Sequence, residues 1–281
     1  MAIWKNKALN CNVFLSCVMS LFGFKKERKN KFGWFGDYKN WDELKALTGG
    51  YEEQSILDIT KHALLKVRNG EAVYERDSVL FDKKLYPYSV ITALLYAAAE
   101  CGGSLNVIDF GGSLGSTYYQ VRDLIPPSVS INWSVIEQNA YIKCGQEHFQ
   151  DETLQFHFTI AESLKAKKAD ILLLSSVVQY LPDPHAFLKE IQDYGFKFII
   201  IDRTAFVKGE RADRLTLQIV PPHIYTAQYP AWFFNEKNFV AHFKHYQIKT
   251  EFESSVPGEE EMEIDGSKQG YDKGFFLIRK S

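Results

Sequence analysis

Residues 107–120 read VIDFGGSLGSTYYQ, and the rest of the chain is interpreted outward from this stretch. An apolar run ends at Asp109, and three closely spaced glycines follow it. Glycine adopts backbone conformations that are closed to other residues and lets a ligand approach the main chain. The pattern predicts a buried strand, a tight turn and the start of a helix, where backbone amides can face the carboxylate of a ligand.

Short apolar runs alternate with amphipathic stretches along the chain after Ser104. The apolar runs, each predicted to be a strand, cover residues 105–110, 130–136, 154–158, 171–174 and 196–201. The amphipathic stretches, each predicted to be a helix, cover residues 116–124, 139–149 and 184–194. Such alternation is typical of a parallel sheet with helices on both faces, which binds ligands at the carboxyl ends of its strands.

The pattern changes after the fifth strand. Residues 204–234 read as a long irregular insertion, and a helix near 235–245 follows. Two strands are expected at 246–252 and 274–279, with a polar, acidic stretch between them. Because no helix separates these two strands, we expect them to pair antiparallel. The sequence therefore predicts an α/β fold with a seven-stranded, mostly parallel sheet and an antiparallel C-terminal strand.

The first 103 residues read as a tail and a helical extension, ahead of a core at 104–281. Apolar residues at helical spacing predict helices within 56–67 and at 88–100. Residues 11–24 are mostly apolar and precede a basic cluster, but this run is too short to span a bilayer and lacks the order of a signal peptide. It leaves open a weak peripheral contact with the inner face of a membrane.

The composition narrows the classes of function. The 33 basic and 35 acidic residues leave a net charge of −2, so no overall field attracts nucleic acid, and a nucleic-acid substrate is disfavoured. The four cysteines form no CxxC pair and do not cluster with histidine at the spacing of metal ligands. We therefore expect a cytoplasmic protein without a metal site.

The glycine-rich stretch resembles the first motif of class I S-adenosylmethionine (SAM) dependent methyltransferases, which have a Rossmann-like fold. By this resemblance the turn holds the methionine part of SAM. Its expected cofactor-binding residues are Asp109, Gly111, Gly112, Ser113 and Gly115. The family commonly has glycine where this chain has Ser113. A nicotinamide-binding G-x-G-x-x-G that begins at Gly111 would meet Ser113 and Ser116, so that alternative fails at two positions.

Three further segments resemble the same family. Glu137 ends the second core strand, where the family's acidic residue accepts hydrogen bonds from the ribose hydroxyls of the cofactor. Glu162 lies in a stretch that resembles the segment beside the adenine. Residues 170–184, DILLLSSVVQYLPDP, resemble the family's fourth strand and the loop after it, so Ser175 is expected to line the cofactor crevice. Tyr180 stands where many relatives carry histidine.

The methyl acceptor is expected to bind where residues 204–234 cover the strand ends. Asp202 ends the fifth strand, and His223 and Tyr225 lie in the insertion, so these three are the candidate catalytic residues. A histidine has a pKa suited to proton abstraction, which favours His223 as the base. Neighbouring tyrosines and a tryptophan could stack on a sugar or another ring.

Residues 33–41, GWFGDYKNW, are a candidate lid or anchor. Together with the glycine-rich motif they resemble a poorly characterised group of methyltransferase-like proteins associated with bacterial surface-polysaccharide genes. The resemblance implies methyl transfer to a small-molecule or sugar-linked acceptor. Two alternatives stay open: a SAM-binding protein that has lost catalysis, and a nucleotide-sugar or NAD enzyme on a related fold.

Overall fold

The computed structural model describes residues 31–48, 54–222 and 224–280 of the chain. Every described helix and strand belongs to the unit Phe32–Ser281. The apolar run at 11–24 and the candidate base His223 lie outside the described residues. None of the described helices is long and apolar enough to cross a membrane.

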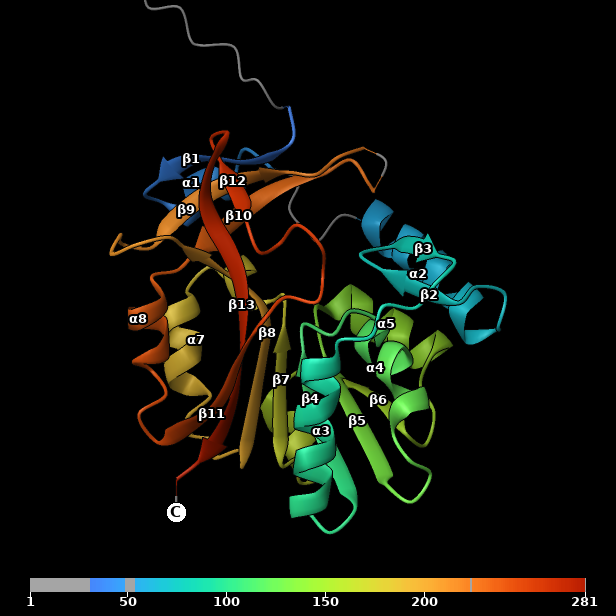
Figure 1. Ribbon diagram of the computed structural model, residues 1–281. Helices are drawn as coiled ribbons and strands as arrows, with labels where there is room; N and C mark the ends of the chain where they lie inside the picture. Colours follow the sequence, from blue (N-terminus) through green and yellow to red (C-terminus); the bar gives the residue numbers. More distant parts are fainter. Residues whose placement is uncertain (1–30, 49–53, 223, 281) are drawn as a thin grey trace, which may run out of the picture. The chain divides into compact units, whose positions relative to one another are not determined.

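The described residues form one eleven-stranded sheet, of which seven strands make up the part called the main sheet here. In chain order they are β4 (Ser104–Phe110), β5 (Ser130–Ile136), β6 (Leu154–His157), β7 (Ile171–Ser175), β8 (Phe198–Val207), β11 (Tyr246–Glu253) and β13 (Ser267–Arg279). Their order across the sheet is β6-β5-β4-β7-β8-β13-β11 (Figure 1). The strands from β4 to β8 pair in parallel, and β13 is antiparallel to β8 and to β11. The predicted Rossmann-like sheet with an antiparallel C-terminal strand is confirmed.

Successive residues of the central strands pack on opposite faces of this sheet. Val107 and Leu173 belong to one hydrophobic cluster, whereas Ile108 and Leu172 belong to the other. The first cluster includes residues of α3 (Tyr88–Glu100), α4 (Ser116–Val121) and α5 (Asn139–His148). The second includes residues of α6 (Ile160–Ala166), α7 (Pro184–Glu190) and α8 (Glu236–Val240). Side chains alternate along a strand, so strands buried on both faces need apolar residues throughout.

The prediction that residues 204–234 are irregular is wrong. β8 continues into this segment, and β9 (Arg214–Ile219) and β10 (Gln228–Phe233) form an antiparallel pair within it. β9 also pairs with β1 (Gly33–Tyr38), β1 pairs with β12 (Met262–Ile264), and β12 pairs with the first residues of β13. A bridge between Phe206 and Phe234 returns this group to β8. The ends of β8 and β13 therefore close a ring with β12, β1, β9 and β10.

The ring has a small hydrophobic core of its own. Its buried residues are Ala205, Val207, Phe233, Met262 and Ile264. Gly270 of β13 has no room for a side chain, because a Cβ there would lie 2.4 Å from the Phe233 ring. β10 accommodates Pro230, which has no N–H to donate, because β10 forms a ladder with β9 alone among the described strands. Buried proline and aromatic residues thus belong to a regular sheet.

The first hundred residues contain strands in addition to the predicted helices. Residues 33–41 form β1 and the start of α1 (Trp41–Lys45), and they are built into the ring. After α2 (Gln54–Arg68), β2 (Tyr74–Arg76) and β3 (Val79–Phe81) form a separate two-stranded hairpin. Its two turn residues, Asp77 and Ser78, have φ of 51° and 68°. Both values match the tight turn that suits the twist of a hairpin, although glycine and asparagine adopt them more readily.

Candidate active site

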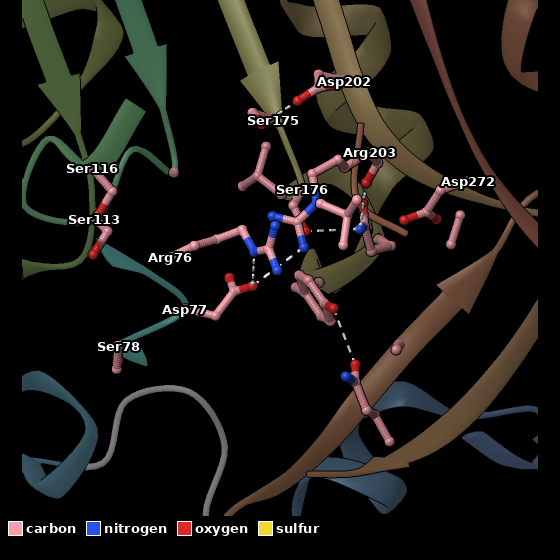
Figure 2. A pocket seen from close by; sticks show the side chains of 18 of the residues that line it. Arg76, Asp77, Ser78, Ser113, Ser116, Ser175, Ser176, Asp202, Arg203 and Asp272 are labelled. Carbon is pink, nitrogen blue, oxygen red and sulfur yellow. Dashed lines mark hydrogen bonds and ion pairs between the residues drawn. The ribbon is translucent and has the colours of Figure 1, made fainter. Parts of the chain in front are cut away.

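A cavity of about 820 Å³ lies at the carboxyl ends of β4, β5 and β7, beside the middle of β8. Its wall includes the loops after these strands, the segment with α2 and the β2–β3 hairpin, the segment between β11 and β12, and the ring. Figure 2 shows Ser113 and Ser116 of the glycine-rich loop on one side, and Asp202, Arg203 and Asp272 on the other. Between them, Arg76 and Asp77 of the hairpin reach toward Arg203.

The loop after β4 packs closely against its surroundings. A Cβ on Gly111, where φ is 75°, would lie 2.2 Å from Val177, and one on Gly112 would lie 2.6 Å from the Asp109 carboxyl carbon. Larger residues would therefore displace the loop. Ser113 keeps a positive φ of 55° in spite of its side chain. Its Oγ is buried, lines the cavity and has no hydrogen-bond partner among the described residues.

Two of the predicted cofactor residues, Asp109 and Gly115, are buried next to this loop. Asp109 is 1% exposed and accepts a hydrogen bond from Trp133 Nε1 at 2.9 Å. Burial raises the pKa of Asp109 to about 7, although the Trp133 hydrogen bond opposes this shift. Gly115 packs against Leu154, 3.0 Å from where a Cβ would lie. Neither Asp109 nor Gly115 is among the described residues of the cavity wall.

Glu137 follows β5 and lines the cavity beside Ser113. Its Oε2 accepts a hydrogen bond from the backbone N–H of Gln138 at 2.6 Å, and the backbone N–H of Ser113 also donates to this carboxylate. Burial raises the pKa of Glu137 to about 7, and the nearby Asp109 raises it further, against the effect of the two backbone donors. The carboxylate is thereby fixed to the loop and has room to accept hydroxyl hydrogens from a ligand.

Of the next two predicted cofactor residues, Glu162 and Ser175, only Ser175 lines the cavity. Glu162 is not among the described residues of the cavity wall. Its Oε2 accepts a hydrogen bond from the Phe158 N–H at 2.9 Å, and its N–H donates to Thr159 Oγ1 at 3.1 Å, so Glu162 helps to cap α6. Ser175, at the end of β7, does line the cavity and donates a hydrogen bond to Asp202 Oδ2 at 2.9 Å. Burial raises the pKa of Asp202 above its usual value.

Arg203 joins three distant segments at the cavity. Its Nε and one terminal nitrogen donate to the two carboxylate oxygens of Glu259 at 3.1 and 2.9 Å. The terminal nitrogen also lies 3.3 Å from Asp77 Oδ2, at the tip of the hairpin (Figure 2). Burial raises the pKa of Glu259, but the Arg203 charge and the hydrogen bonds from Arg203, Ser254 and Asp272 together outweigh this effect and hold the pKa below its usual value. The bidentate contact is the strong geometry for an arginine and a carboxylate.

Asp272 of β13 lies beside Glu259 and Arg203. Burial and the neighbouring Glu259 carboxylate raise the pKa of Asp272 well above its usual value, and the two carboxyl groups share a hydrogen bond. The Oδ1 of Asp272 is buried without a hydrogen-bond partner among the described residues. The Oε1 of Gln179 is also buried without a hydrogen-bond partner among the described residues, whereas its Nε2 donates to the Arg203 carbonyl at 2.9 Å. Two buried hydrogen-bond acceptors therefore remain in the cavity wall.

Aromatic side chains line the end of the cavity nearest the ring. The Tyr225 and Tyr229 hydroxyls lie 3.2 Å apart, and Trp232 Nε1 donates to the Leu181 carbonyl at 3.1 Å. Burial raises the pKa of Tyr225 to about 12, so Tyr225 stays a neutral donor at physiological pH and is a poor base. The described part of the wall contains no lysine or histidine. In the described residues no group of His, Cys, Asp and Glu could hold a metal ion.

Sequence reasoning missed two features of the site: the β2–β3 hairpin, and the acidic residues around Arg203. The latter, Asp77, Glu259 and Asp272, are called the acidic cluster below. Glu75, Asp77, Glu259 and Asp272 come from segments that carry no known motif, and their positions depend on the ring and the hairpin. The short polar turn at Asp77 and Ser78, just before the apolar run at 79–81, could have signalled the hairpin. No local pattern indicates that Arg203 meets residues so far away along the chain.

Comparison with known proteins adds distant similarities. No protein-family model and no curated protein matches the sequence. The N-terminal domain of EvdMO1, solved in the presence of S-adenosylhomocysteine (SAH) and D-fucose, is 11% identical over 82% of this chain and 100% of that chain, with a TM-score of 0.47. The 1,6-didemethyltoxoflavin-N1-methyltransferase of Burkholderia thailandensis is 13% identical over 81% and 90%, with a TM-score of 0.42. Magnesium protoporphyrin IX methyltransferase of Synechocystis PCC 6803 is 12% identical over 68% and 79%, with a TM-score of 0.42. These similarities are too distant to assign a function.

Proposed function

We propose that this protein transfers a methyl group from SAM to a small-molecule or sugar-linked acceptor. The observation that carries the proposal is the joining of the glycine-rich loop to Glu137, through the Ser113 N–H, at the carboxyl ends of β4 and β5. The strand order β6-β5-β4-β7-β8-β13-β11, with β13 antiparallel, supports the same assignment. A nicotinamide cofactor is disfavoured because Ser113 and Ser116 replace two glycines of its fingerprint.

The residues around the loop fit such a cofactor. Glu137 would accept hydrogen bonds from the two ribose hydroxyls, and the unpartnered Ser113 Oγ would find a partner in the bound molecule. Gly111 and Gly112 would bring the loop backbone close to it. SAM supplies a methyl group on a sulfonium, which a nucleophile displaces directly, so the protein mainly orients the acceptor and excludes water.

The acceptor is proposed to bind between Asp202 and the aromatic end of the cavity. Asp202 is the proposed base for an acceptor hydroxyl, because it pairs with Ser175, the last residue of β7, in the middle of β8, and its raised pKa favours taking up a proton. Tyr225 would donate a hydrogen bond to the acceptor. His223 remains a proposed alternative base at a position outside the described residues. Aromatic rings and unpaired hydrogen-bond acceptors suit a sugar, which supports a role in surface-polysaccharide biosynthesis.

Calorimetric titration of the full chain with SAM, SAH and NAD tests the cofactor. We expect SAM and SAH to bind and NAD not to bind. Glu137→Ala should weaken SAM binding by about 1.5–3 kcal/mol, the scale of lost charged hydrogen bonds. The matched control is Glu147→Ala, an exposed glutamate on α5. Binding of NAD in place of SAM, or equal SAM affinity in a folded Glu137→Ala protein, would contradict the proposal.

Turnover separates an enzyme from a SAM-binding protein without catalysis. Formation of SAH from SAM would be followed with nucleotide sugars and oligosaccharides as acceptors. Asp202→Asn should lower the rate by about 10²–10⁴-fold, as expected for loss of a general base, with SAM affinity unchanged. A rate equal to that of the wild type would exclude Asp202 as the base.

A further inference from the structure

Glu75 is a buried carboxylate that the proposed chemistry does not yet use. It belongs to β2 of the hairpin, is 2% exposed and lines the cavity. Its Oε2 accepts a hydrogen bond from Ser116 Oγ at 2.8 Å, and its Oε1 accepts one from the Ser78 N–H at 2.7 Å. Both donors are neutral, and Glu75 forms no salt bridge with a described residue. A buried carboxylate without a cation is costly, so it normally gains one or takes up a proton.

The positions of Glu75 and Glu137 define the two ends of one binding surface. Glu137 accepts a hydrogen bond from the Ser113 N–H, and Glu75 accepts one from the Ser116 hydroxyl. Ser113 and Ser116 lie three residues apart on the glycine-rich loop, on the same side of the cavity (Figure 2). A ligand whose ribose meets Glu137 therefore extends along the loop toward Glu75.

The chemistry of the ligand decides which of its groups suits Glu75. Beyond the ribose, SAM carries a sulfur and an amino-acid end with one ammonium and one carboxylate. Of the groups at that end, only the ammonium complements a carboxylate. We infer that Glu75 binds the α-ammonium of the cofactor, an assignment that rests on the function proposed above. The β2–β3 hairpin then contacts the ligand directly through Glu75, in addition to forming part of the cavity wall.

The charges around Glu75 are consistent with this role. Burial raises the pKa of Glu75 to about 7, and the hydrogen bonds from Ser116 and Ser78 oppose the shift. Asp77 raises this pKa and Arg76 lowers it, so the two charges on the hairpin act in opposite directions. Arg76 also lies 3.7 Å from Asp77, which engages its charge away from Glu75. A ligand ammonium would be the cation closest to the Glu75 carboxylate.

A thermodynamic cycle tests the contact directly. Dissociation constants would be measured by calorimetry for SAH and for deamino-SAH, which lacks only the amino group, with the wild-type protein and with Glu75→Gln. Glutamine removes the charge and keeps an oxygen that can accept from the Ser78 N–H, while its amide nitrogen can donate to the Ser116 hydroxyl, which rotates to accept. We expect Glu75→Gln to weaken SAH binding by about 10–100-fold, the scale of a charged hydrogen bond, and to leave deamino-SAH binding unchanged. Glu71→Gln, an exposed position just before β2, is the matched control and should change neither constant.

The possible outcomes are distinct. Equal weakening of both ligands by Glu75→Gln would show that Glu75 only supports the loop, and would overturn the inference. Unchanged SAH affinity would overturn it as well. If Glu75→Gln does not fold, the wild-type protein still decides the question, because it should bind deamino-SAH at least about tenfold more weakly than SAH. A wild-type protein that binds SAH and deamino-SAH equally refutes the contact alone, whereas one that binds neither SAM nor SAH refutes the proposed function itself.

Discussion

Replacement of Arg203 by methionine should destabilise the protein by about 3 kcal/mol. Loss of one partner from a buried ion pair costs about 3–5 kcal/mol, because the other charge stays buried and uncompensated. Here the Glu259 side chain is 19% exposed, whereas Asp77 is 49% exposed and can turn toward water. Only the Glu259 carboxylate would stay buried without its cation, and it can take up a proton. We therefore expect a loss of stability at the lower end of this range.

Thermal and urea unfolding followed by circular dichroism measure this loss. For a chain of this size, about 3 kcal/mol corresponds to a fall in Tm of about 6 °C. Arg211→Met is the control, because Arg211 is an exposed arginine whose side chain contacts Gln269, and its loss should change Tm little. Asp77→Asn should cost less than Arg203→Met, since Asp77 is the exposed partner. An Arg203→Met protein that unfolds with the wild type would refute the reasoning.

Three further predictions concern the loop and its carboxylates. Asp109, Glu75 and Glu137 have pKa values of about 7 in the folded state and about 4 in the unfolded state. Between about pH 4 and 7 the folded state therefore binds more protons than the unfolded state. Stability of the ligand-free protein should therefore fall as pH rises from about 5 to 7, and Glu137→Gln should make this slope shallower; a urea midpoint that rises over the same range would contradict the signs. Gly112→Ala should cost about 1–3 kcal/mol in urea unfolding, because the new Cβ meets the Asp109 carboxyl, and an unchanged midpoint would show that the loop yields freely. Glu162→Ala should cost about 1 kcal/mol, like the loss of other helix caps, and leave SAH affinity unchanged in calorimetry; a large loss of affinity would restore its adenine role.

The main sheet was predictable because its signals are local. Each strand from β4 to β8 is a short apolar run, and the helices between them show their own periodicity. Glu137 could be assigned because it ends a strand next to the glycine-rich loop. The expected helix at 235–245 was too long, since α8 covers only Glu236–Val240. Strand and helix types were thus easier to predict than their ends.

The ring was not predictable because its strands depend on partners far away in the sequence. β1 pairs with β9 and β12, which lie about two hundred residues later. Pro230 and the Pro221–Pro222 pair made residues 204–234 look irregular, although an edge strand tolerates proline. The contacts of Arg203 follow from these pairings, so the acidic cluster could not be predicted before the ring was known.

The sharing of β8 and β13 between the main sheet and the ring affects how the protein can unfold and respond. Eight aligned residue pairs join these two strands, from Gly270–Val207 to Ile278–Phe198, and the same ladder serves both structures. Neither structure can lose this ladder and remain intact, so both should unfold in one cooperative transition. A rearrangement of the ring around an acceptor would also pull on β8 just beyond Asp202. Occupancy at the aromatic end of the cavity would then alter cofactor affinity through the backbone, without any contact between the two ligands.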